Sequence, residues 1–370
     1  MPDVPARLAS LYLDGDRLAL AVTEESSDGL RVLHADHRRL PHPFERIRRL
    51  RHPVYLDSDL AIYTSEAFLQ EELKRILEPV PADIPVLTVL APDKERREAL
   101  EGSCGEEEQT SRRRQLLRRL LPASPYDYPC LVVMQEQDRE AQVCCTRVIS
   151  VRMAELLPMQ RLVINTGRRH WGTIPGLTAA SVLASRLCAA MGLTRLSLMD
   201  CGALRTLFIS TVDITTTRNN VIPVGYLSTR HAGDRFAREP EEEIPHFAAR
   251  FLSDMITVRG ELDGSEGLCL LGSSGSITSL EERVAGAIGR TPAVVSEEAV
   301  SRLVKDWPAE IPFAAVSMAV GGLLAAGDGV PRQFGPLHGK MVSPPLSEGK
   351  CALWRMKDRR MYVFEQRYPL

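Results

Sequence analysis

Apolar and polar residues alternate along the start of the chain in the manner of β-strands. Three such segments lie within residues 7–37, and the turn Asp14-Gly15-Asp16 separates the first two. Alternation broken by short turns rich in glycine and aspartate predicts a three-strand meander. Residues 65–77 place their apolar side chains on one helical face, so we expect a helix there.

The same design returns in the middle of the chain. Residues 196–210 hold an apolar run, a turn containing Asp200 and Gly202, and a second apolar run, which predicts strand, tight turn and strand. Glycine lets the backbone approach an anion, and an aspartate is able to hold a hydrated divalent cation. Residues 11–22 share this design, about half a chain length away from the second copy. A duplicated protein with one phosphate-binding hairpin in each lobe explains this repeat, and two unrelated hairpins are the alternative.

Later segments continue an alternation of strands and helices, which is typical of an α/β protein. Strands are expected at residues 86–92, 130–136, 141–150, 169–174, 219–225, 268–272 and 293–296. Helices are expected at residues 111–121, 177–191, 241–259, 277–288, 297–305 and 313–326. The stretch after residue 150 is expected to be a helix interrupted at Pro158, because proline disrupts a helix interior.

The length of 370 residues exceeds one ordinary core and predicts two lobes. Residues 1–195 are expected to form lobe I, with a small α+β subdomain inserted at about 84–167. Residues 196–330 are expected to form lobe II, with a helical part at about 235–262, and residues 331–370 a C-terminal tail.

Composition narrows the classes of function. With 44% hydrophobic residues, 25% charged residues and a formal net charge of −2, the chain is typical of a globular protein and does not indicate a nucleic-acid partner. The sequence lacks a glycine-rich loop with a phosphate-binding lysine, which argues against a Walker-type NTPase. The eight cysteines form no C-x-x-C pair, which favours reduced thiols and a cytosolic location. The longest apolar stretch, residues 314–326, is too short to cross a bilayer, so membrane contact is expected to be peripheral or through a partner.

Taken in this order, the segments resemble the actin-like ATPase fold, and they are most similar to the PilM family of type IV pilus assembly proteins. The division protein FtsA and the cytoplasmic part of the GspL secretion proteins are similar relatives. Asp200, Gly202 and Thr206 match the second phosphate segment of this family, and residues 272–280 have the place of its adenosine segment. The resemblance implies a two-lobed α/β actin-like ATPase fold with a small inserted α+β subdomain.

The resemblance also implies a site for ATP and Mg²⁺. Its cofactor-binding residues would be Gly15, Asp16, Asp200, Gly202, Thr206, Gly272, Ser273 and Gly275, and Asp200 would hold the metal.

Two of the three nucleotide segments depart from the family pattern. With Gly15 as anchor, the family's aspartate falls on Leu13, its serine falls on Asp16, and no lysine follows. An aspartate beside phosphates repels the anion unless a metal intervenes. Ser273 and Ser274 stand where the family prefers glycine, and a Cβ there narrows the approach of the backbone to a base and ribose. We therefore expect ATP binding to be weak or lost.

The resemblance implies a cytoplasmic scaffold of a type IV pilus or type II secretion-like assembly, peripheral at the cytoplasmic face of the inner membrane. Its expected partner is a PilN-like inner-membrane protein, bound through the cytoplasmic N-terminal segment of that protein. Strands within residues 84–151 would supply the edge or groove for this segment.

Two other functions stay open at this point. An active ATPase or kinase of the same fold would use Asp200 as the metal carboxylate and Asp14 or Asp16 as a second acid. An FtsA-like filament protein that self-associates would be tethered to the membrane by the basic and aromatic tail at residues 350–364.

Overall fold

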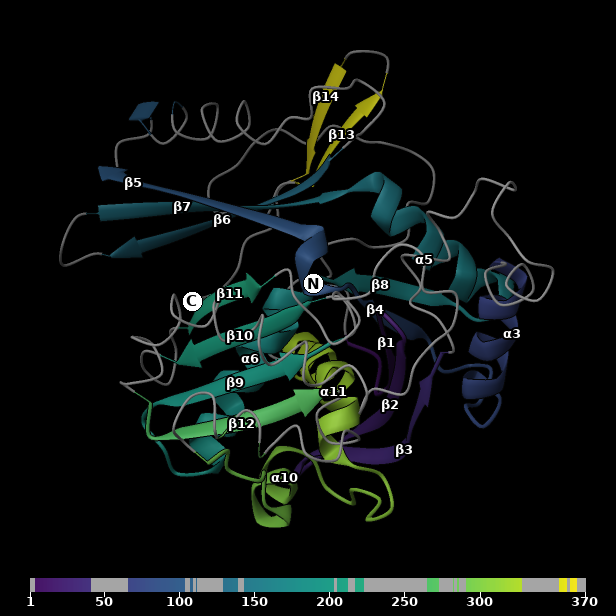
Figure 1. The fold of residues 1–370 in the computed structure, drawn as a ribbon. Helices are drawn as coiled ribbons and strands as arrows, with labels where there is room; N and C mark the ends of the chain where they lie inside the picture. Colours follow the sequence, from purple (N-terminus) through teal and green to yellow (C-terminus); the bar gives the residue numbers. More distant parts are fainter. Residues whose placement is uncertain are drawn as a thin grey trace, which may run out of the picture.

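The computed structural model of this chain describes residues 4–40, 66–103, 129–138, 143–202, 205–211, 217–222, 265–272, 291–327, 353–357 and 360–364, with residues 107, 108, 111, 282 and 285. Within these residues two lobes, each built on its own sheet, face each other, and two helices lie between the sheets (Figure 1). The predicted two-lobed α/β architecture is confirmed.

The sheet of the first lobe contains the predicted meander. Its strands are β1 (Arg7–Asp14), β2 (Arg17–Ser26), β3 (Gly29–Arg39), β4 (Val86–Val89) and β8 (His170–Ile174), in the order β3-β2-β1-β4-β8. The first three pair antiparallel, whereas β4 pairs parallel with β1 and with β8.

The sheet of the second lobe repeats this arrangement. Its strands are β9 (Leu196–Cys201), β10 (Thr206–Thr211), β11 (Thr217–Ile222) and β12 (Gly267–Gly272), in the order β11-β10-β9-β12. Strand β9 pairs antiparallel with β10 and parallel with β12, as β1 does with β2 and β4. The two hairpins β1–β2 and β9–β10 therefore occupy corresponding places in the two lobes, as the sequence repeat predicts.

Two helices rich in small residues join the lobes. Helices α6 (Gly176–Ala190) and α11 (Phe313–Gly327) pack against each other and share one hydrophobic core with residues of both sheets. The far face of the first sheet carries a second core, which is covered by α3 (Glu66–Leu77) and α5 (Met153–Asn165). The short helix α10 (Glu297–Leu303) packs beside α6.

A separate three-stranded sheet forms the inserted subdomain. Strands β5 (Glu95–Ser103), β6 (Pro129–Asp138) and β7 (Val143–Arg152) pair antiparallel in the order β5-β7-β6, and the short 3-10 helix η2 (Pro92–Lys94) leads into them. In the tail, β13 (Leu353–Lys357) and β14 (Arg360–Phe364) form a hairpin near β6 (Figure 1).

The charged segment at 95–103, for which the sequence predicts no element, is a strand, although its residues do not alternate between apolar and polar. Two expectations about secondary structure were wrong. Helix α5 continues through Pro158, because one lost hydrogen bond is outweighed by the burial of its apolar face. At 293–296 only an isolated bridge from Ala293 to Cys269 forms. Four other predictions lie wholly or almost wholly outside the described residues: the helices at 111–121, 241–259 and 277–288 and the helical part at 235–262.

Gly321 of α11 is expected not to tolerate a side chain, because α11 packs closely on α6. A Cβ at Gly321 would lie 2.6 Å from the carbonyl oxygen of Ala179. Gly321→Ala should lower the free energy of unfolding by about 1–3 kcal/mol, measured by urea denaturation. The matched control is Gly327→Ala, near the end of the same helix, where an added Cβ meets no atom within 4 Å. That control should be neutral or stabilising, and equal losses in both variants would contradict the close packing.

Candidate functional site

Four charged residues extend the apolar faces of the two corresponding hairpins. Side chains of a strand alternate between its faces. In the first lobe, Tyr12 and Ala19 face the core that contains α6 and α11, so Asp14 and Arg17, two residues away from each, continue that face.

The second hairpin follows the same rule. Leu198 and Leu207 face the shared core, so Asp200 and Arg205, again two residues away, point toward the first lobe. Strand periodicity thus brings two aspartates and two arginines together between the lobes. We call these four residues the arginine–aspartate clasp.

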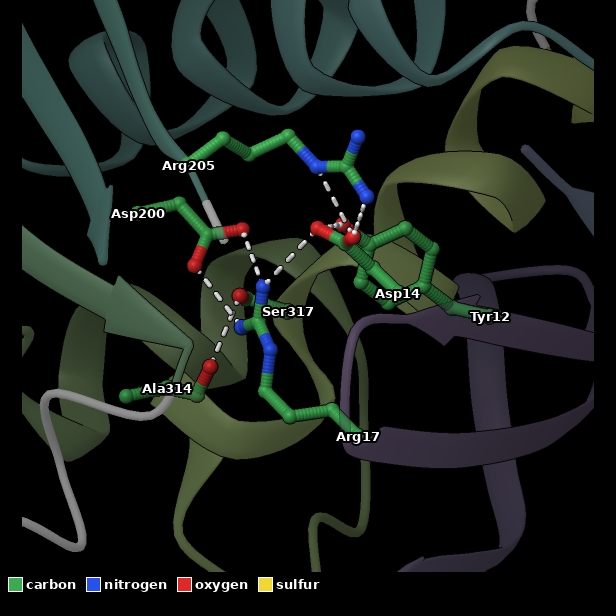
Figure 2. Close-up of polar contacts among 7 residues, drawn as sticks. All are labelled: Tyr12, Asp14, Arg17, Asp200, Arg205, Ala314 and Ser317. Carbon is green, nitrogen blue, oxygen red and sulfur yellow. Dashed lines mark hydrogen bonds and ion pairs between the residues drawn. The ribbon is translucent and has the colours of Figure 1, made fainter. Parts of the chain in front are cut away.

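The arginines of the clasp cross from one hairpin to the aspartate of the other (Figure 2). Arg17 donates from Nη1 to Asp200 Oδ1 at 2.7 Å and from Nη2 to Asp200 Oδ2 at 3.1 Å, which is a two-pronged pairing. In the reverse direction, Arg205 donates from Nε to Asp14 Oδ1 at 2.9 Å, and its Nη2 donates to the same oxygen. The second oxygen of Asp14 accepts from Tyr12 Oη at 2.8 Å and from Arg17 Nη2 at 3.4 Å.

The clasp is buried and electrically balanced. None of its four residues is more than 7% exposed. Burial alone would raise the pKa of Asp14, but the Arg205 and Arg17 guanidinium groups outweigh it and hold this pKa below its ordinary value. Burial would lower the pKa of Arg17, but Asp200 and its other neighbours bring it well above its ordinary value. The clasp thus pairs two arginines with two aspartates, so its formal charges balance.

Tyr12 completes the polar network. Burial first, and then the Asp14 carboxylate, raise the pKa of the Tyr12 phenol well above its ordinary value, so this phenol stays protonated and donates to Asp14. Its ring centroid lies 5.5 Å from the guanidinium carbon of Arg17, within the range of a cation–π contact.

Two predicted glycines border the clasp. A Cβ at Gly202 would lie 3.5 Å from Arg17 Nη2 and 3.6 Å from Asp14 Oδ2. Gly272 has φ of +71°, and a Cβ there would lie 1.8 Å from Asp200 Oδ1 and 1.9 Å from Arg17 Nη1. The space that these glycines leave open is therefore filled by the side chains of the clasp.

Three other predicted residues are placed differently. Gly15 lies in the two-residue turn between β1 and β2, with φ of +58°. Asp16 pairs with Arg39 of β3, which donates from Nε to Asp16 Oδ2 at 2.8 Å. Thr206 is buried on the face of β10 opposite to Arg205.

The remaining predicted cofactor residues, Ser273 and Gly275, lie outside the described residues. The sequence analysis also missed Arg17 and Arg205, although both stand next to an apolar strand and follow an aspartate of the same hairpin. The signal that would have found them is an arginine two residues away from an inward-facing apolar residue of the strand, because such an arginine lies on the same, buried face.

The clasp does not fit a magnesium ion with phosphates in the space that it fills. Asp200, the predicted metal ligand, accepts hydrogen bonds from Arg17 at both oxygens. Within the described part of the chain, no three His, Cys, Asp or Glu side chains are grouped as a metal site would need. A phosphate brought to the clasp would have to displace a carboxylate from a buried arginine.

Comparison with known proteins places the fold. No protein-family model matches the chain, and no curated protein matches its sequence. A chain from a PilM-PilN type IV pilus biogenesis complex is similar, with 15% sequence identity and a TM-score of 0.62, covering 86% of this chain and 98% of that chain. A Bacteroides thetaiotaomicron protein with an actin-like ATPase fold has 12% identity and a TM-score of 0.40, over 80% of this chain and 95% of its own.

The cytoplasmic domain of EpsL, an inner-membrane component of the type II secretion system of Vibrio cholerae, is also similar. It has 14% identity and a TM-score of 0.36, over 63% of this chain and 78% of its own. Identities this low show the fold alone. With its two sheets and corresponding hairpins, this chain therefore has the two-lobed actin-like ATPase fold, which it shares with the chain of the PilM-PilN complex.

Proposed function

We propose that this chain is a scaffold of a type IV pilus or type II secretion-like assembly, with weak or lost ATP binding. The observation that carries the proposal is the fold shared with a chain of the PilM-PilN complex over nearly all of that chain's length. The buried clasp supports it, because Asp200, the predicted metal ligand, is engaged with Arg17 at both carboxylate oxygens. A scaffold needs surfaces for its partners and no catalytic group, so we expect no turnover of ATP.

The partner in this proposal is a PilN-like inner-membrane protein, whose cytoplasmic N-terminal segment binds the inserted subdomain. The chain would then act at the cytoplasmic face of the inner membrane. No helix among the described residues has the length and apolar character to span a bilayer. Strand β5 stands at the edge of the described β5-β7-β6 sheet, which suits the addition of an extended peptide strand.

Isothermal titration calorimetry of the full chain with a synthetic N-terminal peptide of a PilN-like protein from the same organism tests this function. We expect micromolar affinity, equivalent to about −8 kcal/mol, and no binding of a scrambled peptide. If millimolar concentrations of the authentic peptide give no binding heat, the result would contradict the scaffold role.

Proline substitutions in β5 locate the contact. Adjacent N–H groups of a strand point to opposite edges, so one of Ala99→Pro and Leu100→Pro leaves the pairing with β7 intact and removes only a donor on the outer edge. The variant whose melting temperature is unchanged should bind the peptide at least about tenfold more weakly. If that variant binds normally, the peptide does not add to β5, whereas the scaffold role would still rest on the calorimetry of the unmodified chain.

A further inference from the structure

The clasp occupies the place that the resemblance assigns to nucleotide. Gly202, Gly272 and Asp200 are predicted cofactor residues, and the first two leave room that Arg17 and the carboxylates fill. Arg17 therefore lies between the two hairpins that the resemblance assigns to phosphate binding.

The crossed pairing links the lobes in both directions. Each hairpin supplies one aspartate at or next to the end of its first strand and one arginine at or just before the start of its second, and each arginine reaches the aspartate of the other lobe. An opening of the lobes would break both ion pairs, and each of the four charged side chains would lose its partner in the other lobe. Because all four side chains are buried, neither pair is weakened by solvent in the way that surface ion pairs are.

We propose that the two lobes of this protein are held closed by the arginine–aspartate clasp, so that closure does not depend on a nucleotide or a metal ion. Arg17 acts as a built-in cation for two carboxylates, and its planar fork orients Asp200 as a spherical ion would not. This inference does not rest on the scaffold role, because it concerns the closed state of the chain alone.

The experiment compares the full chain with Arg17→Ala by small-angle X-ray scattering and by thermal unfolding. The unmodified protein should keep the same radius of gyration and melting temperature with and without millimolar Mg-ATP. Arg17→Ala should have a larger radius of gyration and a lower melting temperature, because two buried carboxylates face each other across the cleft without the cation that joined them. Arg7→Ala is the matched control, since Arg7 pairs with Glu24 at the surface of the same sheet, and it should leave the radius of gyration unchanged.

Chemical rescue separates a cation site from a general loss of packing. Millimolar methylguanidinium should return the radius of gyration of Arg17→Ala toward that of the unmodified protein and raise its melting temperature by a few degrees. Methylammonium, which has the same charge but no planar fork, should do so less at equal concentration. If Arg17→Ala does not fold, Arg17→Lys takes its place, with a smaller expansion expected because the charge is kept and the fork is lost.

Three results would overturn the proposal. The first is compaction of the unmodified protein, or a higher melting temperature, on addition of Mg-ATP. The second is a radius of gyration for the folded Arg17 variant equal to that of the unmodified protein. The third is equal rescue by methylguanidinium and methylammonium. A failure of the PilN-like peptide to bind would contradict the scaffold role and leave all three measurements unaffected.

Discussion

Arg17→Met should lower the free energy of unfolding by about 3–5 kcal/mol, which is a large part of the stability of a typical domain. The substitution keeps much of the side-chain volume but leaves Asp200 buried without its two-pronged partner. Asp14 keeps Arg205 and Tyr12, so the loss arises mainly at Asp200. Urea denaturation followed by circular dichroism gives the value.

A double-mutant cycle shows whether the loss belongs to the pair. Asp200→Leu alone should also be costly, because it leaves Arg17 buried with its longer contact to Asp14 and its contact with the Tyr12 ring but without its two-pronged partner. The double variant Arg17→Met with Asp200→Leu should cost less than the sum of the single variants, with a coupling of about 2–3 kcal/mol. Arg7→Met is the control for an exposed pair and should change the free energy of unfolding far less than Arg17→Met does. An Arg17→Met variant no less stable than Arg7→Met would refute the energetic role of the clasp.

Gly272→Ala should lower the free energy of unfolding strongly, although it adds only one methyl group beside the clasp. Its Cβ would lie within 2 Å of Asp200 Oδ1 and Arg17 Nη1, so both ends of the ion pair would have to move. Breaking a buried pair costs about 3–5 kcal/mol, and a positive φ adds about 1–2 kcal/mol for any residue with a Cβ. Thermal and urea unfolding of the purified variant measure the sum.

Gly192→Ala separates the two contributions. Gly192 has φ of +69°, close to the +71° of Gly272, but a Cβ at Gly192 meets no atom within 4 Å. This control should show only the backbone cost of about 1–2 kcal/mol. If Gly272→Ala and Gly192→Ala lower the free energy of unfolding equally, the clasp accommodates the added methyl group at no energetic cost.

Most of the framework follows from local patterns in the sequence. The meander, the repeated hairpin and the helices α6 and α11 are long periodic segments whose burial in the structure follows their sequence pattern. Strand β5 could not be predicted in this way, because its residues are largely charged and its place depends on pairing with β7. Pairing between distant segments leaves little trace in the composition of either one.

The candidate site was predicted only in part, for a related reason. Asp200 and Gly202 were found by their resemblance to a phosphate segment and Gly272 by its place in the adenosine segment, and all three lie at the clasp. The partners of Asp200 and Asp14 come from the other half of the chain, so the local sequence says what each hairpin contains but not which charges meet. Asp16, predicted to lie beside phosphates, instead neutralises Arg39 within its own sheet.

The crossed pairing also sets a rule for how this sequence is able to change over time. Arg17 and Asp200 stand 183 positions apart, and Asp14 and Arg205 stand 191 apart. A substitution at any one of these positions leaves a buried charge in the other hairpin, so lasting replacements should arise in matched pairs across the two halves. The two hairpins are thus expected to change together at these four positions rather than separately.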